Sequence, residues 1–132
     1  MPKKILLDTN LLLRFLIEDD IQKAQAVANL LETSKDKLIV TDMAYAELAW
    51  VMASFYKFPR KEIVEKLSSI LNIKNLFLSR QLLADSLVIY SKYNIDFIDA
   101  YHAAFMKKRS MKNIYSYDRD FDKLKDLDRL EP

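Results

Sequence analysis

The chain has 132 residues, of which 51% are hydrophobic and 30% charged, and its 21 Lys and Arg against 19 Asp and Glu give a formal net charge of +2. This composition is typical of a single globular domain over residues 1–132 and argues against disorder. Cysteine and glycine are both absent, which excludes disulfides, thiolate metal sites and glycine-rich phosphate loops.

The chain has no apolar run approaching ~20 residues, the length that spans a bilayer. The segment 1–4 is Met-Pro-Lys-Lys and leads directly into a predicted strand, unlike the apolar core of a signal peptide. We therefore expect a cytoplasmic protein with no membrane partner. The small net charge does not by itself imply a nucleic-acid partner.

Predicted strands and helices alternate along the chain. Short apolar runs predict strands, and apolar residues recurring every three to four positions predict helices. The predicted strands cover residues 4–8, 38–40, 76–78 and 113–116, with Leu130 as a candidate edge-strand residue. The predicted helices cover residues 9–17, 20–32, 41–56, 62–73, 80–93, 96–109 and, as a shorter helix, 119–127. This alternation predicts a three-layer α/β/α fold, with a short, mostly parallel sheet between flanking helices.

Four acidic residues occupy positions where a strand or helix has no structural need for them. Asp8 and Asp118 each close a short apolar run, so each places a carboxylate at the carboxyl end of a strand, where open α/β sheets bind ligands. Glu47 and Asp99 lie near the N-terminal ends of two predicted helices. Converging carboxylates repel by ~1 kcal/mol per pair at 4 Å in water and ~4 at an intermediate dielectric. A hard divalent cation is the usual counter-charge.

Most of these acids also have a purely structural interpretation. Asp8 could cap the first helix, a contact that stabilises by ~1 kcal/mol. Asp96 and Asp99 have the spacing of a capping box, and Asp118 and Asp120 could be turn formers. If the acids share no site, each of them needs its own separate structural role. One shared site explains all of them together and is therefore the better hypothesis.

Glu47 and His102 are both placed by helical periodicity on apolar faces. Glu47 lies among the predicted buried stripe of its helix, where it would need a cation or strong hydrogen-bond donors; the stripe is Ala44, Leu48, Val51, Met52 and Phe55. His102, the single histidine, has the spacing of a second predicted buried face, formed by Ile95, Ile98 and Phe105. We interpret His102 as structural, because metal-assisted hydrolysis does not need a histidine base.

The segments 5–14, 41–48, 96–104 and 116–121, which include Asp-Thr-Asn and Ser-Tyr-Asp-Arg-Asp-Phe, resemble the acidic motifs of PIN-domain nucleases. Their order and the chain length are most similar to VapC-type ribonuclease toxins of toxin–antitoxin systems. The resemblance implies a PIN-like fold and an endoribonuclease dependent on Mg²⁺ or Mn²⁺, with an RNA substrate, a cognate antitoxin and a homodimeric state. It implies that Asp8, Glu47, Asp99 and Asp118 are the catalytic and metal-binding acids, and that Asn10 or Thr9, Asp96 and Asp120 are accessory. Apart from the resemblance, Ser116 could be an accessory hydrogen-bonding residue to the acids, or simply a strand residue that faces a helix.

The chemistry of the acids agrees with this resemblance. Phosphodiester hydrolysis at neutral pH needs an activated water and positive charge on the phosphoryl oxygens, both of which a divalent cation supplies. A set of oxygen ligands suits Mg²⁺ or Mn²⁺. The number of ions, one or two, stays open.

Candidate contacts to partners lie in two kinds of segment. Cations that could border the acids and bind RNA are Arg14, Lys57, Arg60, Lys61, Lys107, Lys108 and Arg109. The cations of the run 107–112 could equally be solvent-exposed side chains with no partner. Their place at the C-terminus of a helix is favoured by the helix dipole. The aromatic segment 48–58 has more large side chains than one helix face can bury, which predicts an interface with a second copy or an antitoxin.

Two other classes of function remain compatible with the sequence. A phosphotransferase or phosphatase would use Asp8 as its nucleophile, but such an enzyme is expected to have a second Asp two positions on, where this chain has Asn10. A non-catalytic PIN-like module that binds RNA or protein would not need all four acids. Metal titration separates such a module from a nuclease.

Overall fold

The computed structural model describes residues 1–132 as two compact units, Met1–Arg80 and Gln81–Pro132. The predicted single domain over residues 1–132 stays a prediction. None of the helices combines the length and the apolar character that crossing a membrane requires.

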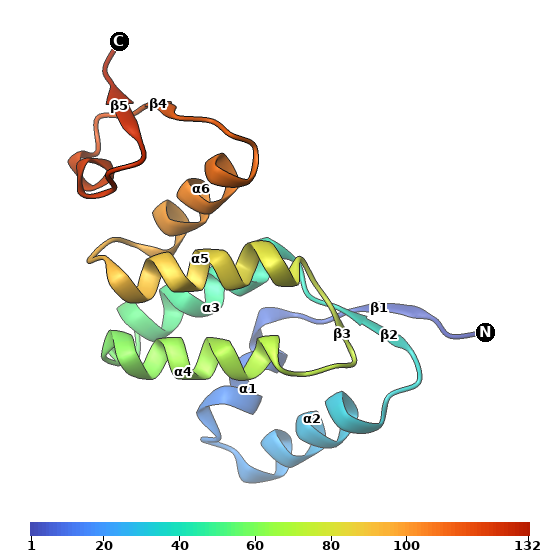
Figure 1. Ribbon diagram of the computed structural model, residues 1–132. Coiled ribbons are helices and arrows are strands. Elements are labelled where there is room, and N and C mark those ends of the chain that lie inside the picture. The colour runs from blue at the N-terminus through green and yellow to red at the C-terminus, as the bar shows by residue number, and fades with distance from the viewer. The chain divides into compact units, whose positions relative to one another are not determined.

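The first unit contains a parallel three-stranded sheet with β2 at its centre. Ile5 of β1 is in register with Leu38 of β2, which is in turn in register with Leu76 of β3. Parallel neighbours need long crossovers, and each crossover here contains two helices (Figure 1). The order is β1 Lys4–Leu6, α1 Thr9–Ile17, α2 Ile21–Thr33, β2 Lys37–Ile39, α3 Asp42–Ser54, α4 Arg60–Leu71 and β3 Leu76–Phe77.

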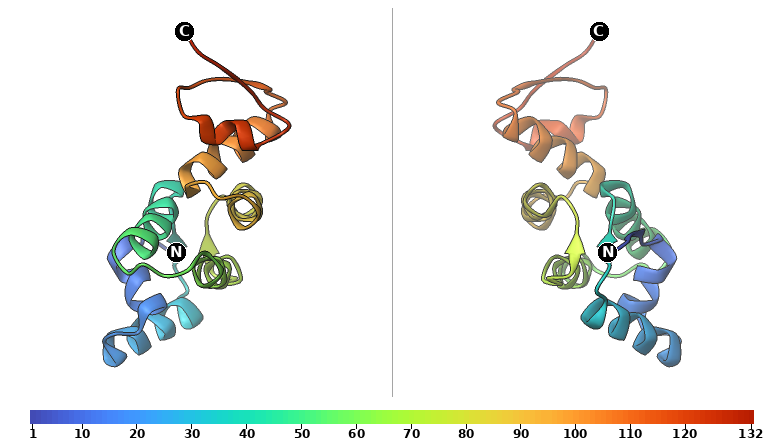
Figure 2. Two further views of the ribbon diagram at one scale, coloured as in Figure 1. Left: turned by 90° about the vertical axis from the view of Figure 1, so that its left-hand side faces the viewer. Right: turned by 90° about the vertical axis from the view of Figure 1, so that its right-hand side faces the viewer.

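The core of the first unit forms where apolar side chains at helical spacing meet the central strand. Leu38 of β2 is fully buried, and helices α1 and α2 lie side by side (Figure 2). Tyr45 of α3 is buried and donates its hydroxyl to the carbonyl oxygen of Leu67 in α4 at 2.9 Å, which joins these two helices. The other large, fully buried side chains of this unit are Leu12, Val40, Leu48, Met52, Ile63, Leu67 and Ile70.

Helix ends in the first unit follow the capping residues. The Asp20 carboxylate accepts from the backbone N–H of Lys23 at 3.1 Å, and Thr41 Oγ1 accepts from that of Ala44 at 3.1 Å. Because the chain has no glycine, other residues take the left-handed conformation that glycine favours at helix ends. Those in the first unit are Glu18 (φ 58°) and Lys57 (φ 54°), and Ser110 (φ 56°) follows the same rule in the second.

The second unit contains two helices, a parallel pair of short strands and a short 3₁₀ helix (Figure 1). Ile114 of β4 is in register with Arg129 of β5, so the predicted strand at Leu130 is confirmed. The predicted helix over 119–127 is a shorter 3₁₀ helix. The order is α5 Arg80–Lys92, whose first residue is the last residue of the first unit, then α6 Phe97–Lys108, β4 Asn113–Tyr115, η1 Arg119–Lys123 and β5 Asp128–Leu130.

The predicted buried face around α6 was right at Ile95, which is buried, and wrong at Ile98 and His102. Ile98 is 51% exposed and His102 is exposed, so the interpretation of His102 as a core residue fails. The buried side chains of this helix are Phe97, Ala100, Ala103, Ala104 and Met106. Alanines let a helix approach its neighbours closely, and periodicity scored on the largest apolar side chains therefore selects the wrong face.

Replacing Tyr45 with Phe should lower the free energy of unfolding by about 1 kcal/mol, because the substitution removes a buried hydrogen bond and leaves the ring in place. Chemical denaturation measures this difference. Tyr115→Phe is the matched control, since Tyr115 is 71% exposed and its replacement should change stability by less than ~0.5 kcal/mol. Equal stability of both variants would show that the Tyr45 hydroxyl does not stabilise the fold.

Candidate metal centre

Three acidic side chains of the second unit converge. Asp99 comes from the first turn of α6, and Asp118 and Asp120 come from the turn that leads from β4 into η1. One carboxylate oxygen from each of the three lies within 4.8 Å of the others. The sequence singled out all three, but it assigned Asp120 only an accessory role.

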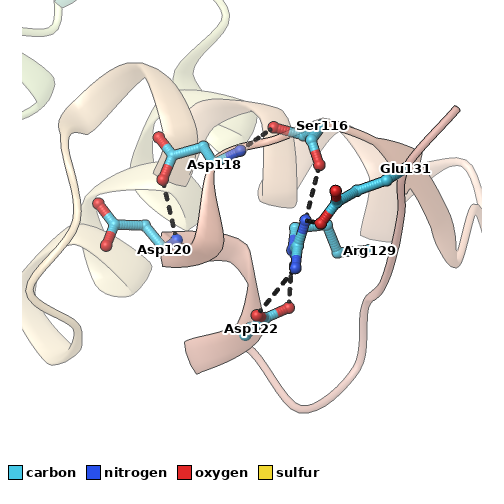
Figure 3. A network of polar contacts seen from close by, with 6 residues as sticks. All are labelled: Ser116, Asp118, Asp120, Asp122, Arg129 and Glu131. Atoms are coloured by element: carbon cyan, nitrogen blue, oxygen red, sulfur yellow. Dashed lines mark hydrogen bonds and ion pairs between the residues drawn. The ribbon is translucent and has the colours of Figure 1, made fainter.

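The turn that carries Asp118 and Asp120 is held by local hydrogen bonds (Figure 3). The backbone N–H of Asp118 donates to Ser116 Oγ at 3.0 Å, and Asp118 Oδ1 accepts from the backbone N–H of Asp120 at 2.9 Å. Asp118 is therefore the N-cap of η1. Ser116, predicted to support the acids, contacts the turn through its hydroxyl.

Lys123 contributes a cation that the sequence analysis did not single out. Its ammonium lies 3.0 Å from Asp120 Oδ1 and donates to the carbonyl oxygen of Asn94 at 2.8 Å. The three-residue spacing from Asp120 to Lys123 is the one signal in the sequence that could have indicated the pair. The ammonium offsets part of the negative charge at one edge of the cluster.

Asp99 shows the electrostatic consequence of the cluster. Partial burial raises the pKa of its carboxyl group, and the negative charges of Asp118, Asp96 and Asp120 raise this pKa further. His102, one turn along α6, acts in the opposite direction. The site thus disfavours full ionisation unless a cation is present.

Asp8 and Glu47 belong to the first unit. Asp8 occupies the N-cap position of α1, but its side chain makes no capping hydrogen bond, so capping does not account for this acid. Next to it, Thr9 is buried and Asn10 exposed. Glu47 is exposed on α3, and its predicted place on the buried stripe was therefore wrong. Its role as a metal ligand stays a prediction.

Asp96 follows the same pattern as Asp8. It is the N-cap residue of α6 by position, but its side chain makes no capping hydrogen bond. Its charge instead raises the pKa of Asp99. The capping-box interpretation of the 96–99 pair is therefore not supported by the hydrogen bonds of Asp96.

The predicted RNA-binding cations are distributed over both units. In the first unit, Arg14 is paired with Asp19 at 3.2 Å, Lys57 and Lys61 are exposed, and Arg60 is half-buried. In the second unit, exposed cations follow one another at the end of α6, where the Arg109 guanidinium lies 3.7 Å from the centre of the Phe105 ring. The exposed run there is Lys107, Lys108 and Arg109.

The aromatic segment 48–58 divides into packed and exposed side chains. Tyr56 and Phe58 stack with ring centroids 5.4 Å apart, and the Lys66 ammonium lies 5.6 Å from the centre of the Phe58 ring. Trp50 and Phe55 are 63% and 76% exposed. These two side chains account for the predicted excess of apolar surface.

The donor set of the cluster fits a hard divalent cation. Asp99, Asp118 and Asp120 offer carboxylate oxygens only, the ligand type that Mg²⁺ and Mn²⁺ prefer. Neither nitrogen nor sulfur ligands belong to this group of side chains.

Comparison with known proteins places the chain among established relatives. Residues 5–127 match the family described as the PIN domain. The chain is 31% identical over 123 residues to the VapC ribonuclease of Aquifex aeolicus (strain VF5), and the alignment covers 90% of each protein.

Replacing Asp99 with Asn should stabilise the metal-free protein at pH 7 and not at pH 3. Because the folded-state pKa of Asp99 is raised, the native state binds this proton more tightly than the unfolded state, and ionisation costs stability once the pH rises through that pKa. Asn cannot ionise, so the variant avoids this cost. Thermal melts in EDTA at the two pH values measure the difference. Asp126→Asn, which removes an exposed carboxylate outside the cluster, should not reproduce it.

Proposed function

The chain belongs to the PIN-domain family, and we propose on that basis that it is a metal-dependent endoribonuclease and the toxin of a toxin–antitoxin pair, acting in the cytoplasm. The observation that carries this proposal is the convergence of Asp99, Asp118 and Asp120 within 4.8 Å. Each pair of these like charges is repulsive, so a bound cation would stabilise the arrangement.

We propose that Asp99 and Asp118 hold Mg²⁺ or Mn²⁺, with Asp120 as a third ligand. Asp8 and Glu47 are proposed as further ligands on the strength of their motifs. When bound, the cation activates water and offsets negative charge on the phosphoryl oxygens. The chain's own residues then have two tasks: the carboxylates orient the cation, and the Ser116 hydroxyl and the Asp120 N–H keep the Asp118 carboxylate in place.

RNA is the proposed substrate because the relative with 31% identity is a ribonuclease. Exposed cations are needed to offset the phosphate charges along such a chain. The three consecutive cations at the end of α6, Lys107, Lys108 and Arg109, are the proposed backbone contacts of the second unit, and Arg14, Lys57, Arg60 and Lys61 those of the first. Single-stranded RNA is favoured, since its bases and backbone are open to such contacts.

Replacing Asp8 or Asp99 with Asn should lower RNA cleavage by more than ~100-fold, because a neutral amide is a poor ligand for a hard cation. Gel-based cleavage assays with Mn²⁺ measure the loss. Asp126→Asn is the control and should retain parental activity. Near-parental cleavage by both D8N and D99N would show that neither Asp8 nor Asp99 is needed for catalysis.

The reaction should stop when EDTA is added, and its products should carry 5′-phosphate and 3′-hydroxyl ends. Water is the attacking group in this mechanism, so the 2′-hydroxyl of RNA is not consumed. End-labelling and mass spectrometry of the fragments identify the ends. A 2′,3′-cyclic phosphate, or cleavage that survives chelation, would contradict the mechanism even with RNA as substrate.

The protein should form a homodimer that uses Trp50 and Phe55, because exposed large apolar side chains are enriched at protein interfaces. Trp50→Lys should shift the molar mass in multi-angle light scattering from that of a dimer to the 15.5 kDa of one chain. Val88→Lys is the control, because Val88 is also exposed, at 51%, but lies outside this segment. A parent protein that is monomeric at micromolar concentration would refute the dimer. The antitoxin would then be the remaining candidate partner for this segment.

A further inference from the structure

We propose that Arg129 is a positioning residue of the metal centre, because its guanidinium fastens both ends of the turn that carries Asp118 and Asp120. The significance of this turn for metal binding rests on the proposed function. The contacts themselves lie wholly within the second unit.

Arg129 contacts the turn on both sides of its acids (Figure 3). On the near side, Nη1 donates to the carbonyl oxygen of Ser116 at 2.9 Å. On the far side, Nε and Nη2 donate to the two carboxylate oxygens of Asp122 at 3.0 and 3.4 Å. Ser116 lies two residues before Asp118, and Asp122 lies two residues after Asp120. One side chain therefore spans the segment that delivers both metal-site carboxylates.

The guanidinium also contacts the residue that directly follows its own strand. Arg129 belongs to β5, and its side chain is only 11% exposed, whereas those of Asp122 and Glu131 are about half exposed. Glu131 accepts from Nη1 at 2.6 Å. A planar guanidinium with paired donors fixes the direction of its partners as well as their distance. Arg129 therefore makes four side-chain hydrogen bonds while its own side chain is mostly buried.

A continuous chain of hydrogen bonds connects Arg129 to the acids. Arg129 fixes the Ser116 carbonyl, the Ser116 hydroxyl accepts from the Asp118 N–H, and the Asp118 carboxylate accepts from the Asp120 N–H. The Asp118 and Asp120 carboxylates lie on the side of the turn away from Arg129 (Figure 3). Arg129 is thus a positioning residue that acts through the backbone, and it leaves the acids free to face a cation.

The contacts of Arg129 with Ser116 and Asp122 should lower the cost of binding a cation. Mutual repulsion favours separation of the Asp99, Asp118 and Asp120 carboxylates, and a turn that opens would have to be closed again at each binding event. A turn fastened at both ends keeps the ligands near their bound arrangement and lowers that cost. Loss of Arg129 should therefore weaken metal binding.

The test compares Arg129→Met with Arg129→Lys by two measurements. The first is amide hydrogen exchange of Asp118 and Asp120 in the metal-free protein. The second is the Mn²⁺ dissociation constant from calorimetry. Arg129→Met should exchange these two amides at least ~10-fold faster and bind Mn²⁺ about 10- to 100-fold more weakly, the range seen when groups supporting a metal ligand are removed. Arg129→Lys should have exchange rates and a Mn²⁺ affinity between those of Arg129→Met and the parent. An ammonium keeps the positive charge but lacks the paired, planar donors of a guanidinium.

Two further variants separate positioning from stability. Arg80→Met removes a guanidinium that donates to the carbonyl oxygens of Leu71, Ile73 and Leu76 in the first unit. It should lower the melting temperature and leave Mn²⁺ affinity within about twofold of the parent. Glu131→Gln removes the charge of the one partner of Arg129 that does not belong to the turn, and should leave both amide exchange and Mn²⁺ affinity close to parental.

A folded Arg129→Met protein with parental amide exchange and parental Mn²⁺ affinity would overturn the proposal. If Arg129→Met does not fold, Asp122→Asn is used in its place. Faster amide exchange of Asp118 and Asp120 in Asp122→Asn than in Glu131→Gln would support the proposal, and equal exchange would refute it. Absence of Mn²⁺ binding in the parent would refute the proposed function alone. The exchange rates of Asp118 and Asp120 would still decide the role of Arg129.

Discussion

Repulsion among carboxylates is the constraint on which the second unit depends. The oxygens lie within 4.8 Å of one another, so each pair of ionised groups costs at least ~0.9 kcal/mol in water and ~3.5 kcal/mol at an effective dielectric of 20. The chain opposes this cost locally. Asp99 lies in the first turn of α6, where the helix dipole favours negative charge. Asp118 accepts a backbone N–H, and Asp120 is paired with Lys123. The remaining charge is what a divalent cation would neutralise.

The order of the elements, and the bounds of most of them to within two residues, could be predicted because local signals agree with the fold. Pro59 lies at the start of α4, as its fixed φ and missing N–H favour. Asp20 and Thr41 cap α2 and α3 with their side chains. The placement of Asp118 directly after the β4 segment indicated a carboxylate delivered by a strand, and the structure brings it together with Asp99.

The features that escaped prediction depend on packing between distant segments. Glu47 has the spacing of a buried residue, but α3 buries Tyr45 and Ala49 beside Leu48 and leaves Glu47 exposed. On α6 the alanines, and not Ile98, are buried. Arg129 gave no signal at all, since an arginine in a short C-terminal strand resembles an ordinary edge residue. Its importance is visible only when Ser116 and Asp122 are seen on either side of it.

A titration of ¹⁵N-labelled metal-free protein with substoichiometric Mn²⁺, followed by paramagnetic broadening of the amide resonances, tests the metal centre directly. The amides of Asp99, Asp118 and Asp120 should broaden first, ahead of exposed acids elsewhere in the second unit such as Asp126. Broadening that is uniform over the surface acids, or confined to positions away from these three, would contradict the assignment of the cluster as a metal centre.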